Sequence, residues 1–153
     1  MSDLEIEILL VEDNAADVEL TLHALRKENL ANKIETVADG EDALDFLFCR
    51  GRFADRRFER PPRLVLLDLK LPKVDGLEVL RAVKEDLRTR AIPVVILTAS
   101  REEKDMVNGY QLGANAYIQK PVDFEQFRNI VKELGLFWLV VNQPAPVAAF
   151  QPA

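Results

Sequence analysis

Short apolar segments alternate with amphipathic helical segments along almost the whole chain, and this alternation constrains the fold more than any other feature. Apolar runs at Ile6–Val11, Leu64–Leu67 and Val94–Leu97 are typical of strands buried on both faces. Weaker runs at Lys33–Val37 and Ala116–Gln119 predict two further strands. Five strands separated by helices favour an α/β fold in which a parallel sheet is covered by helices on both faces.

The segments between these runs carry apolar residues at helical spacing. Three stripes stand out, formed by Val18, Leu22 and Leu25, by Leu77, Leu80 and Val83, and by Phe124, Phe127, Ile130, Val131 and Leu134. Right-handed crossovers place the carboxyl ends of all the strands at one edge of such a sheet, where open α/β sheets bind their ligands. The Arg-rich segment Cys49–Pro62 is predicted to be an irregular surface loop.

Composition narrows the class of protein. The chain has 153 residues, 48% of them hydrophobic, and a formal net charge of −6, which together indicate one acidic globular domain. The negative charge argues against a nucleic-acid partner. Cys49 is the only cysteine, Met1–Glu7 lacks the features of a secretory signal, and no apolar stretch is long enough to span a membrane. We therefore expect a cytoplasmic protein without a membrane partner.

Polar residues follow the predicted strands at the points where the strands end. Glu12 and Asp13 come after the first strand, Asp68 after the third, Thr98 after the fourth and Lys120 after the fifth. Three acids brought together repel one another unless a cation lies among them, and oxygen ligands suit Mg²⁺. An aspartate beside a metal, a lysine and a hydroxyl is equipped to accept a phosphoryl group. The set therefore predicts phosphoryl transfer onto Asp68.

These motifs resemble those of a known family. The chain is similar to the receiver domain of bacterial two-component response regulators over roughly Ile6 to Leu134, a likeness carried by Val11-Glu12-Asp13-Asn14, Leu67-Asp68-Leu69-Lys70-Leu71-Pro72, Asp75-Gly76, Leu97-Thr98-Ala99-Ser100 and Lys120-Pro121. The resemblance implies a flavodoxin-like (CheY-like) (βα)₅ doubly wound sheet with strand order 2-1-3-4-5. It also implies a receiver domain over residues 1–135 and a separate C-terminal extension over 136–153.

The resemblance assigns roles to individual residues. Asp68 becomes the phosphoacceptor, modified to an aspartyl phosphate, and Lys120 binds the phosphoryl group. Mg²⁺, with Mn²⁺ or Ca²⁺ as substitutes, is bound by Asp13, Asp68 and the backbone carbonyl of Lys70, with Glu12 assisting through water. Thr98 and Tyr117 become the switch residues, and the Lys120–Pro121 peptide bond is expected to be cis.

A narrower resemblance concerns the partners. The Ala43–Leu47 segment, the long loop to Pro61-Pro62 and the apolar Phe137-Trp138-Leu139 extension look like the single-domain regulators paired with cyanobacterial and bacterial phytochromes. This likeness implies a phytochrome histidine kinase as phosphodonor. It also implies a homodimer that uses Phe137, Trp138 and Leu139 as an arm. Independently of the likeness, the terminal residues Ala148–Ala153 are expected to be frayed. The alternative for the apolar segment is that it folds back and caps its own domain.

Two other functions are compatible with an aspartate at a strand end. A phosphatase of the haloacid-dehalogenase type also forms an aspartyl phosphate, but it needs a second acid two residues after the nucleophile, and Lys70 stands there. A pseudo-receiver would use the same fold only for binding, which the complete set of acids and Lys120 disfavours. We therefore expect a phosphoacceptor signalling protein and not an enzyme. Its downstream target is not specified by the sequence.

Overall fold

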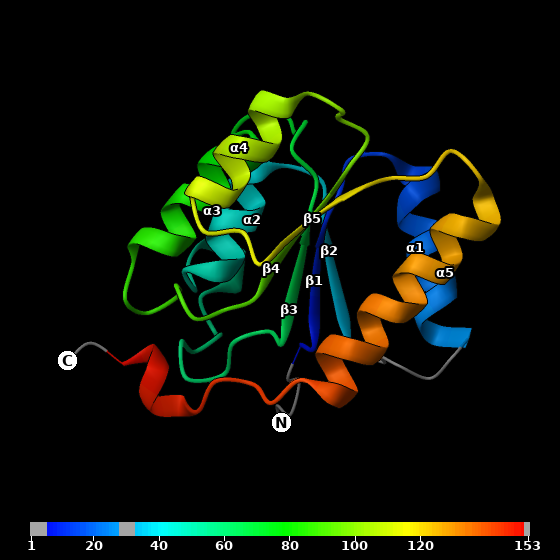
Figure 1. The fold of residues 1–153 in the computed structure, drawn as a ribbon. Coiled ribbons are helices and arrows are strands. Elements are labelled where there is room, and N and C mark those ends of the chain that lie inside the picture. The colour runs from blue at the N-terminus through cyan, green and yellow to red at the C-terminus, as the bar shows by residue number, and fades with distance from the viewer. Residues whose placement is uncertain (1–5, 28–32, 152–153) are drawn as a thin grey trace.

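The computed structural model describes residues 6–27 and 33–151, which form one sheet between two layers of helices (Figure 1). Its five parallel strands lie in the order β2-β1-β3-β4-β5, as predicted. Their bounds are β1 Ile8–Val11, β2 Ile34–Val37, β3 Leu64–Leu67, β4 Val94–Thr98 and β5 Ala116–Gln119. The α/β fold and its strand order are therefore confirmed.

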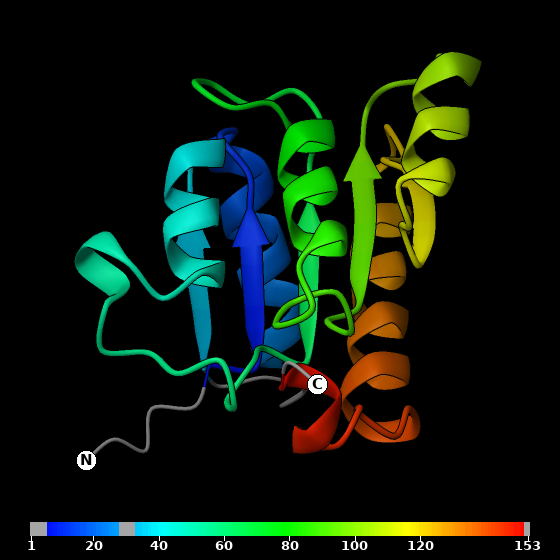
Figure 2. The ribbon, with the colours of Figure 1, turned by 90° about the vertical axis from the view of Figure 1, so that its left-hand side faces the viewer.

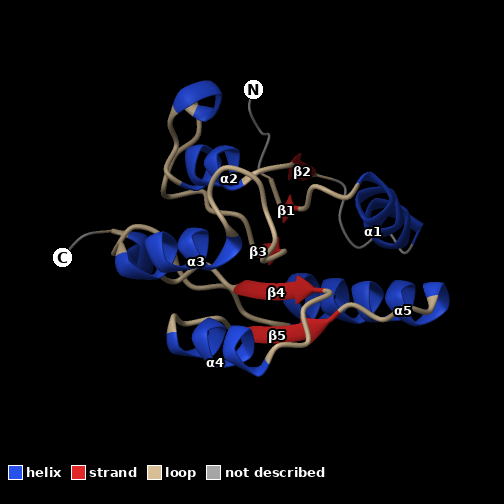
Figure 3. Cartoon of the chain, turned by 90° about the horizontal axis from the view of Figure 1, so that it is seen from above, coloured by secondary structure: helices blue, strands red, loops and turns tan. Residues whose placement is uncertain are grey.

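Helices cover both faces of the sheet. They are α1 Ala15–Lys27, α2 Gly40–Leu47, α3 Gly76–Glu85, α4 Glu103–Gln111 and α5 Phe124–Gly135. Helices α1 and α5 pack together on one face, and α2, α3 and α4 cover the other (Figures 1 and 3). The three predicted apolar stripes lie on α1, α3 and α5. Side-chain carboxylates of residues directly before the helices cap several amino-terminal ends, including Asp75 for α3 and Asp123 for α5.

The central strands are buried on both faces, which explains their continuous apolar sequence. Every residue of β1, β3 and β4 is buried. Alternate side chains point to opposite faces, so Leu9 and Val65 belong to the α2–α3–α4 side while Ile8 and Leu66 belong to the α1–α5 side. This rigid sheet fixes the positions of the residues that follow each strand.

The predicted surface loop between α2 and β3 is more ordered than expected. It contains a 3₁₀ turn, η1 (Gly51–Phe53), and the ring of Phe53 is buried beside Phe46. The guanidinium of Arg56 donates hydrogen bonds to the carbonyl oxygens of Phe46 and Arg60 and lies over the Phe46 ring. Arginine and aromatic side chains thus hold the loop against α2.

The chain after α5 crosses the edge of the sheet instead of ending free in solvent. A π-helical turn, η2 (Leu136–Val141), continues α5, and a 3₁₀ turn, η3 (Val147–Phe150), follows it. Phe150 is 4% exposed and belongs to the core on the α2–α3–α4 side. The prediction of a frayed tail is therefore wrong for residues 148–150, because burial of the Phe150 ring holds the segment. Pro152 and Ala153 lie outside the described residues.

The Lys84 side chain joins α3 to the segment that precedes β4 and to the start of β5. Its Nζ donates to the carbonyl oxygens of Ile92 (2.7 Å) and Arg90 (3.0 Å) and to Oδ1 of Asn115 (3.2 Å). Burial lowers the pKa of Lys84 to about 8.

Among the described helices, none is long and apolar enough to cross a bilayer.

We expect Lys84→Met to lower the free energy of unfolding by about 2 kcal/mol, because three acceptors lose a charged donor while the aliphatic stem is kept. Urea denaturation at neutral pH measures the change. Lys104→Met is the matched control, since the Lys104 side chain is 75% exposed and a change there is expected to alter stability by less than about 0.5 kcal/mol. Equal stability of the two variants would contradict the prediction.

Candidate functional site

The polar residues predicted from strand ends lie at the carboxyl edge of the sheet. The arrowheads of β1 and β4 point to the same edge in Figure 2, and the parallel pairing extends this direction to every strand. The Asp68 N–H donates to the Val11 carbonyl (3.1 Å), and the Lys120 N–H donates to the Thr98 carbonyl (2.7 Å). Backbone pairing therefore continues into the residues that carry the site.

The Lys120 amine is the centre of the cluster. Its Nζ lies 2.5 Å from Oε1 of Glu12 and 3.2 Å from Oδ2 of Asp68. The three side chains are nearly closed to solvent, with 9% of Lys120, 5% of Glu12 and 10% of Asp68 exposed. The structure thus brings the lysine and two of the predicted acids into direct contact.

Asp17 is a fourth acid of the cluster, and the sequence interpretation missed it. Its Oδ2 lies 2.8 Å from Lys120 Nζ. Asp17 stands in the first turn of α1, where its N–H donates to Oδ1 of Asn14. The available signal was its position directly before the helical stripe that starts at Val18. Asp17 does not directly follow a strand, so the strand-end pattern does not include it.

The electrostatics of the cluster follow from burial and proximity. Burial raises the pKa of Glu12 to about 7 and the nearby Asp68 carboxylate raises it too, although the hydrogen bond from Lys120 opposes both. Burial alone would lower the pKa of Lys120, but hydrogen bonds to Asp17 and Glu12 and the charge of Asp68 outweigh it and hold this pKa above its usual range. Lys120 is therefore a permanently charged ammonium at neutral pH.

Three carboxylates form a group with the geometry of a cation site. One oxygen each from Glu12, Asp13 and Asp68 lie within 4.8 Å of one another. A cavity of about 400 Å³ adjoins this group and is lined in part by Asp13, Lys70 and Asp105. Asp13 is exposed toward solvent, whereas Glu12 and Asp68 are buried. A set of hard oxygen donors beside open space fits a hydrated divalent ion such as Mg²⁺.

The backbone around Asp68 is held closely from two sides. Oδ1 of Asp68 accepts a hydrogen bond from the Leu69 N–H (2.7 Å). Gly76 begins α3 directly against this turn, and its N–H donates to the Leu69 carbonyl (2.9 Å). A side chain at Gly76 would bring its Cβ within 2.3 Å of the Asp68 carbonyl oxygen. The Asp75-Gly76 motif therefore serves close packing of α3 against the Asp68 loop.

Thr98 and Tyr117, the two predicted switch residues, both bond to Ser100. The buried Thr98 hydroxyl accepts from the Ser100 N–H (3.3 Å), and the Tyr117 hydroxyl donates to the Ser100 carbonyl (3.4 Å). The Ser100 hydroxyl in turn donates to Oδ2 of Asp105 (2.6 Å). In this conformation the hydrogen bonds of both side chains lead to the β4–α4 loop and not to Asp68.

The peptide bond between Lys120 and Pro121 is trans, since no cis bond occurs among the described residues. The prediction of a cis bond is therefore wrong for this structure. The trans form is the intrinsically favoured isomer even before proline. In this trans form, the Lys120 amine contacts Glu12, Asp17 and Asp68.

The predicted arm residues after α5 divide into two groups. Leu139 is 6% exposed and packs with Trp138 against the α1–α5 side of the core. Phe137 is 48% exposed. An exposed apolar strip, called the η2 strip below, consists of Leu136, Phe137, Val140 and Val141. The segment thus caps its own domain with one side and presents apolar side chains on the other.

Comparisons with known proteins identify the family of the chain. Residues 8–132 match the response regulator receiver domain family. The chain is 44% identical over 140 residues to the probable methanogenesis regulatory protein FilR2 of Methanothrix harundinacea, covering 91% of this chain and 88% of FilR2. It is 37% identical over 139 residues to the response regulator Rcp1 of Synechocystis, covering 90% of this chain and 92% of Rcp1.

Solved structures of two such proteins share the fold. The phosphorylated cyanobacterial phytochrome response regulator RcpA has a TM-score of 0.84 and 41% identity, over 90% of this chain and 96% of that one. The Mn²⁺-bound form of Rcp1 has a TM-score of 0.84 and 36% identity, over 90% of this chain and 97% of that one. The family match spans every strand and all five acidic, hydroxyl and lysine positions predicted from strand ends. The chain therefore belongs to the response regulator receiver family and is related to phytochrome-associated regulators of two-component signalling.

Proposed function

We propose that this response regulator accepts a phosphoryl group on Asp68 from a histidine kinase. The observation that carries the proposal is the contact between the Lys120 amine and Oδ2 of Asp68 (3.2 Å) inside a cluster of carboxylates. A carboxylate oxygen of Asp68 attacks phosphorus, and the bond from phosphorus to the imidazole nitrogen of the kinase phosphohistidine breaks. The released imidazole nitrogen takes up a proton from solvent.

Residues around Asp68 are placed to hold the transferred group. Lys120 contributes a fixed positive charge beside Asp68, and its contacts with Glu12 and Asp17 keep the amine in place. The proposed Mg²⁺ ligands are Asp13, Asp68 and the backbone carbonyl of Lys70, with Glu12 assisting through water; Mn²⁺ or Ca²⁺ can substitute. When bound, the ion offsets negative charge on the phosphoryl oxygens. Thr98 then turns its hydroxyl toward the phosphoryl group and Tyr117 follows, which alters the surface around α4 and β5.

Incubation with acetyl phosphate and Mg²⁺, followed by intact mass measurement, tests the chemistry directly. We expect the native chain to gain the mass of one phosphoryl group and Asp68→Asn to gain none. Asp45→Asn is the matched control, because Asp45 lies on α2 and pairs with Arg50 away from the cluster; it should label like the native chain. Labelling of Asp68→Asn at the native level would refute the proposal.

The kinase is proposed to be a phytochrome, on the strength of the relatives RcpA and Rcp1. A surface for a protein partner lies next to the site, since Val122 is 93% exposed and Phe124 61% exposed directly after Lys120 and Pro121. Transfer from a phosphorylated phytochrome kinase should be fast compared with transfer from an unrelated histidine kinase. Equal rates from both kinases would contradict this part of the proposal.

Lys70 is proposed to set the lifetime of the phosphoryl group. It stands two residues after Asp68, is exposed, and lines the cavity that adjoins the carboxylate group. Its positive charge beside the phosphoryl oxygens is expected to alter hydrolysis, so Lys70→Ala should change the dephosphorylation rate severalfold. Decay of the phosphorylated mass after removal of the donor measures this rate, and equal rates would refute the idea.

We further propose that the chain forms a two-fold homodimer through the η2 strip. Contiguous exposed apolar side chains of this kind commonly mark protein interfaces. Because Leu139 and Trp138 pack within their own domain, the strip and not the whole segment is the proposed contact.

Phe137→Glu combined with Val140→Glu should convert the dimer to a monomer in light scattering, because each dimer would bury four carboxylates. Both residues are exposed in the single chain, so the folded monomer should persist and still accept a phosphoryl group at Asp68. Leu87→Glu is the control, an exposed apolar residue (44%) outside the strip. A double variant that stays dimeric, or a native chain that is monomeric at every concentration, would defeat the proposal.

A further inference from the structure

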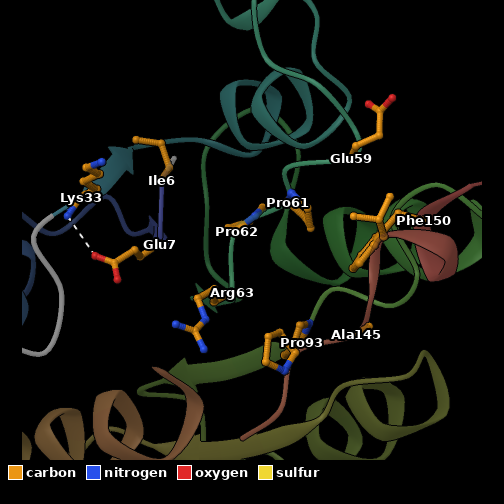
Figure 4. Close-up of a pocket in the computed structure, with 12 residues that line it drawn as sticks. Ile6, Glu7, Lys33, Glu59, Pro61, Pro62, Arg63, Pro93, Ala145 and Phe150 are labelled. Carbon is orange, nitrogen blue, oxygen red and sulfur yellow. Dashed lines mark hydrogen bonds between the residues drawn. The ribbon is translucent and has the colours of Figure 1, made fainter. Parts of the chain in front are cut away.

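A cavity lies at the edge of the sheet opposite the candidate phosphoryl site (Figure 4). Its volume is about 570 Å³. Glu7, Arg63 and Pro93, which stand directly before β1, β3 and β4, line it together with Ala145 and Phe150 of the tail. The cavity is thus formed where the C-terminal tail crosses the amino-terminal ends of the central strands.

The side chain of Arg63, which lines this cavity, has a nitrogen without a hydrogen-bond acceptor among the residues that the structure describes. Its backbone N–H donates to the Glu7 carbonyl (2.8 Å), which fixes the residue against β1. The Nε atom of its guanidinium is buried and has no hydrogen-bond partner within the described part of the chain. Buried polar atoms in folded proteins are almost always paired, so the Arg63 guanidinium has hydrogen-bonding capacity that the described residues do not use.

The acids near Arg63 do not neutralise it through any contact that the structure shows. Oε1 of Glu7 accepts from the Lys33 N–H (3.4 Å), and Figure 4 draws this bond on the side of the cavity away from Phe150. The Glu59 carboxylate points away from Arg63 in the same view. Among the described residues the Arg63 guanidinium therefore has no carboxylate partner, and Arg63 lines the cavity.

The walls beside the guanidinium are apolar and stiff. Phe150 is 4% exposed, and proline rings at positions 61, 62 and 93 line the space. Proline has no N–H and a fixed φ, so these residues present apolar surface without further polar demands. Lys33, Glu7 and Glu59 also line the cavity, but the forked Arg63 cation beside the proline and Phe150 walls matches a carboxylate carried on an apolar body.

From this geometry we propose that the cavity binds a small carboxylate with an apolar body. The carboxylate accepts hydrogen bonds from the Arg63 guanidinium, and the apolar body packs between Pro93 and Phe150. Since Phe150 belongs to the tail, bound ligand also favours the docked position of residues 144–150. The site is distinct from Asp68 and is independent of phosphoryl transfer.

Phenylacetate is a suitable probe, and 2-phenylethanol is its neutral counterpart. Titration of the full chain, followed through backbone amide shifts, should show saturable binding of phenylacetate with changes at Ala145 and Phe150. We expect 2-phenylethanol to bind at least tenfold more weakly. No saturable shift with phenylacetate, or equal affinity for the two compounds, would overturn the proposal.

Two variants test the assignment of the site. Arg63→Met keeps the apolar stem and should weaken phenylacetate binding at least tenfold, and Phe150→Ala should weaken both compounds. Phosphoryl uptake at Asp68 shows that each variant is folded. Native-like affinity in folded Arg63→Met would overturn the proposal. If Arg63→Met does not fold, the comparison of the two compounds on the native chain decides alone.

Discussion

Lys120→Met is expected to destabilise the metal-free protein by about 3–5 kcal/mol, the cost of removing one partner from a buried ion pair. Lys120 Nζ is the shared donor for Glu12, Asp17 and Asp68, and the exposed fractions of Lys120, Glu12 and Asp68 are 10% or less. Without the ammonium, buried carboxylates face one another with no cation between them. The loss is a large fraction of the 5–15 kcal/mol by which domains are typically stable.

Urea denaturation in the presence of a chelator measures this loss. Lys104→Met, on exposed α4, is the control and should leave the unfolding midpoint nearly unchanged. Added Mg²⁺ should recover part of the stability of Lys120→Met, because a divalent ion replaces the missing positive charge. A Lys120→Met chain as stable as the native one without metal would show that the cluster is not held by this amine.

The sheet could be predicted from the sequence because burial on both faces leaves a strong pattern. The segments Leu64–Leu67 and Ala116–Gln119 are strands with the predicted bounds. The first strand was predicted from Ile6 but begins at Ile8, since strand ends are set by pairing with neighbours and not by apolarity alone. The strand order came from the family resemblance, which carries topology that local patterns do not.

The site was predictable to the extent that it follows strand ends. Glu12, Asp68 and Lys120 each follow a strand at the same edge of the sheet, and the long Lys120 side chain reaches the two acids from there. Asp17 was missed because it reaches the lysine from a helix, and its role depends on where the first turn of α1 lies relative to Lys120. The burial of Phe150 was missed for a similar reason: a single aromatic residue among prolines and alanines has no periodicity, and only the tertiary fold offers it a place.

Asp13→Asn should raise the stability of the metal-free protein, which is the opposite of the effect of Lys120→Met. In the presence of Mg²⁺ it should remove most of the stabilisation that the ion provides. The carboxylate oxygens of Glu12, Asp13 and Asp68 lie within 4.8 Å of one another, so neutralising exposed Asp13 relieves repulsion. At this separation, with water nearby, the relief is about 1 kcal/mol. Metal-free Asp13→Asn should therefore unfold at slightly higher urea concentration than the native chain.

With Mg²⁺ the order of stability should reverse. At 100 times its Kd the ion stabilises the native chain by about 2.7 kcal/mol, since it binds the folded state only. Loss of a direct carboxylate ligand should weaken Mg²⁺ binding by at least about 100-fold, the upper end of the effect of losing an outer partner. At the same Mg²⁺ concentration, the ion should therefore stabilise Asp13→Asn by less than about 0.5 kcal/mol.

Thermal unfolding across a Mg²⁺ titration separates the two effects within one experiment, because the metal-free intercept reports repulsion and the slope reports binding. Glu19→Gln is the control, an exposed acid on α1 that is not part of the carboxylate group; its titration should parallel that of the native chain. An Asp13→Asn chain stabilised by Mg²⁺ as strongly as the native one would place the ion elsewhere. Since Lys120→Met and Asp13→Asn are predicted to shift metal-free stability in opposite directions, charge balance within one cluster accounts for both, whereas a general loss of packing would lower stability in each.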